Sequence, residues 1–191
     1  MDFSFSQEQT LVAESVRSFA RDVLLPKYAR WDRNDEFPRE QWPQMGALGL
    51  LGMRVPAEYG GSDFECVTAG IAMEETARGD FNVCYGLLNS CFVGELLGTF
   101  ASETVKRTWL PGMASGQKVL CVCLTEPHCG SDAAAIRTSA VRRGDRWVLN
   151  GEKSAITLLM AGHAGVVFAK TQPDAGSRGV QLSLSRSIRL G

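Results

Sequence analysis

The sequence has few of the residues that build metal and thiol sites. It contains only two histidines, and no two of its six cysteines form a C-x-x-C pair, the spacing typical of zinc and redox motifs. We therefore expect no metal ion. Cys121 and Cys123 lie two residues apart on an apolar stretch, where we interpret them as small apolar side chains of one strand face, so catalytic thiol chemistry is not expected either.

The sequence also lacks an excess of charge of either sign. Lys and Arg number 20 and Asp and Glu number 21, for a net charge of -1, which provides no basic face for nucleic acid. No apolar run approaches the roughly 18 to 20 residues that a membrane span needs, and the N-terminus has no basic start. We expect a cytoplasmic protein that neither spans a membrane nor binds nucleic acid.

The first hundred residues show helical periodicity. Ser6 is followed three residues later by Gln9, the pattern of a capping box. Apolar residues then recur at helical spacing from Leu11 to Leu24, and Pro26 ends the helix. Further helices are predicted over residues 38–48, 66–78, 81–100 and 103–112. The helix over 81–100 is apolar almost all round, which is typical of a helix buried in a bundle.

The character of the sequence changes near residue 116. Beyond it, short apolar segments alternate with turns that contain Gly144 and Gly151. Strands are predicted over residues 119–124, 138–142, 146–149, 153–157 and 165–169. The sequence therefore predicts an α+β fold, with an N-terminal all-α helical domain over residues 1–115 and an incomplete β-barrel domain over 116–191.

A polar turn follows the first predicted strand. Residues 124–132 read L-T-E-P-H-C-G-S-D, so that Pro127 and Gly130 end the strand while hydroxyl and carboxylate side chains gather at the turn. Backbone N–H groups in such a turn can hold a pyrophosphate. An ordinary strand followed by a surface loop is the alternative interpretation of this segment alone.

Three segments in order resemble the acyl-CoA dehydrogenase family. The first is residues 123–132, which resemble the flavin-contacting T-E-P-x-x-G-S-D strand and loop of that family. The second is residues 145–153, D-R-W-V-L-N-G-E-K, which lead into Ile156 and Thr157. The third lies upstream, in G-L-L-G at 49–52 and V-P-A-E-Y-G-G-S at 55–62. The resemblance covers roughly residues 3 to 180.

The resemblance implies an FAD-dependent oxidoreductase that removes two hydrogens from the carbons next to an acyl-CoA thioester. An electron-transferring flavoprotein is the implied electron acceptor, and a homo-oligomer is the implied assembly. In this family a glutamate of a C-terminal helical bundle is usually the catalytic base. No residue of this sequence matches it, so we assign no catalytic residue. Glu126 is interpreted as a structural contact at a strand end, and Glu152 as a solvated charge in a turn.

The same resemblance implies one wall of a flavin site. Thr125 and Thr157 supply hydroxyls of the type that the family directs at the polar edge of the flavin ring. Gly130 permits close backbone approach, and Ser131 contacts the pyrophosphate or the substrate. The expected cofactor-binding residues are Val122, Cys123, Leu124, Thr125, Gly130, Ser131, Ile156 and Thr157, and Ser131 is also the expected substrate-binding residue.

Two other functions remain open from the sequence. One is a related flavin oxidase or monooxygenase with the same fold, and the other is a non-catalytic truncated binding module whose flavin-like loop is vestigial. The end of the sequence also departs from the family pattern, although alternation of Leu182, Leu184, Ile188 and Leu190 with polar residues favours an amphipathic strand. Without a C-terminal bundle, apolar faces of the helices would be exposed, and we expect association.

Overall fold

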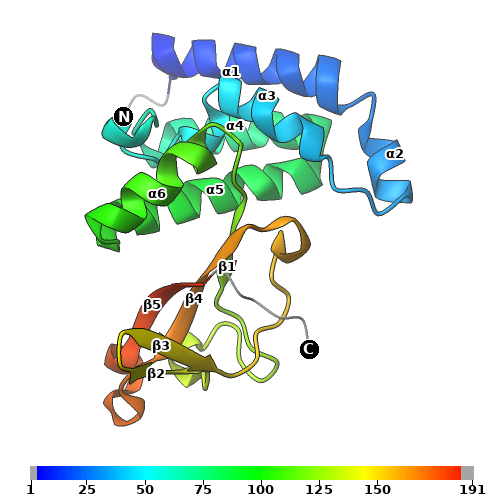
Figure 1. The fold of residues 1–191 in the computed structure, drawn as a ribbon. Helices are drawn as coiled ribbons and strands as arrows, with labels where there is room; N and C mark the ends of the chain where they lie inside the picture. The colour runs from blue at the N-terminus through cyan, green and yellow to red at the C-terminus, as the bar shows by residue number, and fades with distance from the viewer. Residues whose placement is uncertain (1–3, 186–191) are drawn as a thin grey trace. The chain divides into compact units, whose positions relative to one another are not determined.

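The computed structural model describes residues 4–185. The chain divides into two compact units, a helical unit over Met1–Val119 and a sheet unit over Leu120–Gly191. Figure 1 shows the helices in the first unit and the strands in the second. The confirmed fold class is therefore a helical N-terminal domain followed by a partial sheet domain, as the periodicities predicted.

Helix α1 spans Gln7–Phe19 and continues as a short π-helix over Ala20–Leu24. The predicted capping box is confirmed, because the Ser6 hydroxyl accepts a hydrogen bond from the Gln9 N–H (3.1 Å) and the Ser6 N–H donates to the Gln9 side chain (3.0 Å). Leu11 belongs to the predicted apolar stripe, yet its side chain is exposed. The side of α1 that faces the core is therefore narrower than the predicted apolar stripe, and Leu11 lies outside it.

The remaining helices agree in part with the predicted ranges. Their bounds are α2 Tyr28–Arg33, α3 Trp42–Ala47, α4 Cys66–Gly79, α5 Phe81–Phe100 and α6 Glu103–Ala114. The predicted ranges of α4 and α5 are confirmed. The helix predicted over 38–48 is wrong in its first half, where a 3-10 turn over Arg39–Gln41 precedes α3. The short helix α2 was not predicted, and α6 ends at Ala114, just beyond its predicted end at Gly112.

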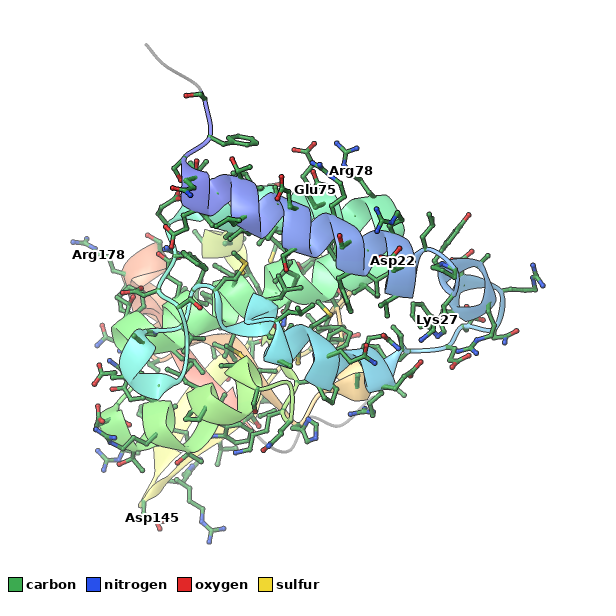
Figure 2. The ribbon with its side chains drawn as sticks, turned by 90° about the horizontal axis from the view of Figure 1, so that it is seen from above. Asp22, Lys27, Glu75, Arg78, Asp145 and Arg178 are labelled. Carbon is green, nitrogen blue, oxygen red and sulfur yellow. The ribbon has the colours of Figure 1, made fainter. Side chains whose placement is uncertain are left out.

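The core of the helical unit forms where α1 packs on α4, α4 on α5, and α5 on α6. The buried Glu75 of α4 accepts two hydrogen bonds from the Arg17 guanidinium of α1, at 3.0 and 2.7 Å. Those hydrogen bonds lower the pKa of Glu75 against the opposing effect of its burial. Arg78 lies 3.3 Å from the same carboxylate, and Figure 2 shows Glu75 and Arg78 side by side next to α1.

Helix α5 has one buried and one exposed apolar side. Its exposed side carries large residues about one helical turn apart at Phe81, Tyr85, Leu88 and Phe92, and another about two turns later at Phe100. The expectation that no apolar run approaches the length of a membrane span is wrong for α5, which alone among the described helices is long and apolar enough to cross a membrane by length and composition, with a mean hydropathy of 1.3. That test is also passed by core helices of globular domains, so it is weak evidence for a span.

The sheet unit is built around β4, Ala164–Lys170. Strand β1, Leu120–Cys123, pairs with β4 in parallel, so that Val122 lies opposite Val166. Strand β5, Val180–Ser185, pairs with β4 in antiparallel. The remaining two strands, β2 Ser139–Arg143 and β3 Arg146–Asn150, form a hairpin that meets β4 at its last residue. Figure 1 shows this hairpin, and Figure 2 labels Asp145 in its turn.

One predicted strand of this unit is wrong. Residues 153–157 form no strand, because Ala155 takes a left-handed backbone conformation (φ 53°), as does Leu158 just beyond (φ 66°), and a strand cannot continue through such residues. The predicted alternation near the end of the chain is confirmed for Leu182 and Leu184, which lie on β5. Ile188 and Leu190 lie outside the described residues.

Candidate functional site

The first group of predicted site residues lies on strand β1 and directly after it. Because side chains alternate along a strand, Cys121 and Cys123 are both buried while Val122 and Leu124 are half-buried. The two sulfur atoms lie 3.9 Å apart, and the cluster they form includes Val167 of β4. The side chain of Cys123 is therefore part of the core, whereas Val122 of this strand and Leu124 just after it have accessible surface.

The hydrogen bond between the two thiols shifts their pKa values in opposite directions, and it lowers the pKa of Cys123 against the opposing effect of burial. The hydrogen bond with Cys123 and burial both raise the pKa of the Cys121 thiol, so this group stays protonated at neutral pH. Ile156 packs as a half-buried side chain against the same cluster. The structure thus brings the predicted residues Cys123 and Ile156 together as neighbours, with Cys123 buried and Ile156 half-buried.

After β1 the chain makes a tight turn. Glu126 and Cys129 exchange two backbone hydrogen bonds, from Glu126 N–H to Cys129 O (3.0 Å) and from Cys129 N–H to Glu126 O (3.1 Å). Gly130 and Ser131 follow at exposed positions. A Cβ atom added at Gly130 would meet no protein atom within 4 Å. The fold itself leaves open space at this glycine, where another molecule can approach the backbone.

Glu126 is the most buried polar residue of this turn, with 3% of its surface exposed. Its carboxylate accepts hydrogen bonds from the backbone N–H groups of Arg137 (2.7 Å) and Thr138 (3.0 Å), and from the Lys153 ammonium (2.8 Å). Burial raises the pKa of Glu126, but the hydrogen bonds from Lys153, Thr138 and Arg137 together outweigh it and lower the pKa to about 2. Glu126 is thus a fixed carboxylate and a structural contact.

Lys153 was not among the predicted site residues, although it ends the second family-like motif. Its ammonium donates to the carbonyl of Leu124 (2.9 Å) as well as to Glu126. The next residue, Ser154, donates its N–H to the carbonyl of Thr125 (3.0 Å). A carboxylate that immediately follows an apolar strand requires a cation when it is buried. This requirement is the feature of the sequence from which a role for Lys153 could have been predicted.

The segment after Lys153 carries the second group of predicted site residues. Thr157 is exposed and lies between the left-handed residues Ala155 and Leu158. Strained backbone of this kind costs about 1 to 3 kcal/mol per residue and gathers at functional sites. The hydroxyls of Thr125, Ser131 and Thr157 have no hydrogen-bond partner within residues 4–185. These three groups are therefore available to a ligand.

Donor atoms of Glu126, His128 and Cys129 lie within 4.8 Å of one another. This cluster does not suit a metal ion. The carboxylate already accepts three hydrogen bonds, and the His128 Nε2 atom lies 3.2 Å from the carbonyl of Ala135, so a cation would have to displace Lys153 and break that contact. His128 is accordingly a loop residue that contacts a neighbouring carbonyl.

The residues present fit a flavin dinucleotide better than they fit a metal ion. Apolar, half-buried Val122 and Leu124 offer surface of the kind a flat ring requires, and unpaired hydroxyls lie on both segments. The exposed turn at Gly130 leaves room that a side chain would otherwise fill. The hydrogen bond from Ser154 to Thr125 joins the two segments.

Comparison with known families covers both units. The acyl-CoA dehydrogenase N-terminal domain matches residues 6–117, and the acyl-CoA dehydrogenase middle domain matches residues 121–187. Among curated proteins, the human mitochondrial short-chain specific acyl-CoA dehydrogenase is 40% identical over 176 residues, which make up 91% of this chain and 42% of that protein. The chain thus spans somewhat less than half the length of this relative.

Solved structures give the same result. The glutaryl-coenzyme A dehydrogenase in its glutaryl-CoA complex is 32% identical, with a TM-score of 0.90, and the match covers 97% of this chain and 48% of that one. The FAD complex of PigA is 28% identical, also with a TM-score of 0.90, and the match covers 98% of this chain and 50% of that one. Both likenesses extend over the helical and the sheet unit.

Proposed function

This chain belongs to the acyl-CoA dehydrogenase family, and from that premise we propose that its sheet unit forms one wall of an FAD site. The reaction served by this site is the dehydrogenation of an acyl-CoA thioester between its α and β carbons. When bound, FAD supplies the hydride acceptor for this reaction. The residues of this chain bind and orient the cofactor and the thioester.

The observation that carries the proposal is the joining of two distant segments by hydrogen bonds. Ser154 N–H donates to the carbonyl of Thr125, so that the end of β1 and the segment that leads to Thr157 are held together. Both segments present hydroxyls without protein partners. Hydrogen bonds from such hydroxyls to the polar edge of a flavin would fix the ring and stabilise its reduced anion.

Each predicted site residue has a distinct part in this proposal. The side chains of Val122 and Leu124 give the apolar surface for the ring, whereas Cys123 and Ile156 support that surface from the core. The open backbone at Gly130 and the hydroxyl of Ser131 bind the pyrophosphate, or the acyl-CoA in the case of Ser131. None of the described residues is assigned as the base that removes the α proton.

The wider parts of the proposal concern partners. We propose an electron-transferring flavoprotein as the acceptor of electrons from the reduced flavin, and a homo-oligomer as the assembly. The relatives that match this chain are about twice its length, and the full reaction needs groups beyond those described here. The activity is therefore proposed for the complete enzyme, and the half-site is proposed for this chain.

The experiment is an FAD titration of the 191-residue chain, followed by quenching of flavin fluorescence. Thr157→Val should weaken binding up to about tenfold, the value of one lost hydrogen bond of roughly 0.5 to 1.5 kcal/mol. Thr99→Val, at an exposed position on α5, is the matched control and should bind as the parent chain does. A parent chain without measurable affinity for FAD would contradict the proposed half-site.

A further inference from the structure

A single lysine links the two segments that carry the proposed cofactor contacts. We propose that Lys153, paired with Glu126, is a positioning residue of the cofactor site that holds residues 124–126 in the conformation required for binding, without touching the cofactor itself. This inference rests on the proposed function above. It assigns a role to an ion pair that the dehydrogenation chemistry does not use.

The geometry places Lys153 at a junction. Its ammonium reaches two acceptors of the first segment at once, the Leu124 carbonyl at 2.9 Å and the Glu126 carboxylate at 2.8 Å. The side chain is 11% exposed and that of Glu126 is 2% exposed, so water cannot easily replace either partner. The ammonium thus makes two charge-assisted hydrogen bonds, and together they restrict the backbone conformation between Leu124 and Glu126.

The residue between those two acceptors is Thr125. Its own carbonyl accepts from Ser154 N–H at 3.0 Å. Three consecutive residues are therefore held by two consecutive residues of the other segment: Leu124 and Glu126 by Lys153, and Thr125 by Ser154. Thr157 lies three residues after Ser154, so the register set by these hydrogen bonds holds the backbone of Thr125 close in the chain path to that of Thr157.

Glu126 extends the same arrangement to a third segment. Its carboxylate also accepts from the N–H groups of Arg137 and Thr138, just before β2 begins. Without the lysine, this buried carboxylate would keep its backbone donors and lose the cation that balances its charge. The turn would then rearrange toward water or another donor, since an uncompensated buried charge is costly.

The neighbouring basic side chains do not offer a substitute. The His128 ring lies 3.7 Å from the other carboxylate oxygen and contacts the Ala135 carbonyl. Arg137 is exposed and contributes its backbone N–H to this carboxylate. Lys153 is the cation that bonds to both the carboxylate and the strand end, so its removal should affect the register of the site more than removal of another lysine of this unit.

The test compares variants of the 191-residue chain for FAD affinity and for the visible spectrum of bound FAD at saturation. Lys153→Met removes the ammonium, and Lys153→Arg restores a cation. Lys170→Met, at a half-buried position on β4, is the matched control. Circular dichroism gives the folded fraction of each variant, so that affinity is expressed per folded molecule.

We expect Lys153→Met to weaken FAD binding at least about tenfold, the loss that corresponds to one or two hydrogen bonds. The shape of the visible absorption band of bound FAD should also change. Lys153→Arg should recover most of the affinity, and Lys170→Met should match the parent chain. A folded Lys153→Met chain with parental affinity and spectrum would overturn the positioning role. If Lys153→Met does not fold, Glu126→Gln replaces it, with the same expected direction of change.

Amide hydrogen exchange separates this inference from the proposed function. If the parent chain binds no FAD, the proposed function fails for this chain. Amide hydrogen exchange in Lys153→Met still tests whether Lys153 positions residues 124–126. Faster exchange at Ser154 and Cys129 with unchanged exchange at Val166 of β4 supports the local role. Exchange that is unchanged at Ser154, or accelerated equally across the sheet unit, would overturn it.

Discussion

Acid should destabilise the sheet unit through one buried carboxylate, Glu126. In the folded chain its pKa is about 2, below the ordinary value near 4.5. A carboxyl group whose pKa is lowered by folding stabilises the folded state at pH values above the unfolded pKa, and this contribution disappears as the pH falls through the folded pKa. The loss should therefore extend from about pH 5 down to about pH 2.

The magnitude follows from the same two values. A pKa that falls from near 4.5 to about 2 on folding corresponds to roughly 3 kcal/mol of stability at neutral pH. The residue is 3% exposed, so screening by water reduces this figure little. A contribution of this size is a large fraction of the stability of an ordinary domain, which is about 5 to 15 kcal/mol.

The assay is amide hydrogen exchange of the whole chain, resolved on peptides from each unit, for the parent chain and for Glu126→Gln. It is measured between pH 5 and pH 2.5, and the rates are corrected for the intrinsic exchange rates at each pH. The parent sheet unit should lose stability over this range, and the variant should start less stable and lose less. Glu152→Gln, at an exposed position two residues after β3, is the control and should follow the parent. An identical pH dependence in the parent and Glu126→Gln would refute the reasoning.

Three further results are expected. Gly116→Ala should destabilise the helical unit by about 2 kcal/mol or more in chemical denaturation, because φ at this position is +77° and the added Cβ would lie 2.2 Å from the Trp42 carbonyl oxygen. Ser6→Ala should cost about 1 kcal/mol in the same assay through loss of the α1 cap. Leu88→Lys combined with Phe92→Lys should reduce self-association in sedimentation velocity, because both side chains lie on the exposed apolar side of α5.

Much of the helical unit could be predicted because its signals are local. The capping box at Ser6 and the long helix over Phe81–Phe100 depend on neighbouring residues, and both were correct. The short helix over Tyr28–Arg33 has too few apolar residues to show a period, so packing rather than pattern decides it. The exposure of Leu11 likewise depends on where other helices pack, which the periodicity does not contain.

The sheet unit was harder to predict because its contacts are distant in sequence. The segment over 153–157 has the composition of a strand, yet left-handed residues and hydrogen bonds to the end of β1 give it another conformation. The motif at 123–132 located the turn, but alternation along β1 directs the Cys123 side chain into the core. The role of Lys153 arises from a partner 27 residues away along the chain, which a local pattern does not reveal.

The central claim is that FAD binds to the sheet unit along two segments joined by hydrogen bonds. The most direct test is FAD titration of the ¹⁵N-labelled 191-residue chain, followed by amide chemical shifts. The largest saturable shifts should occur at Thr125, Gly130, Ser131 and Thr157, with small changes in the helical unit. Shifts that are absent, or that are largest outside these segments, would contradict the account.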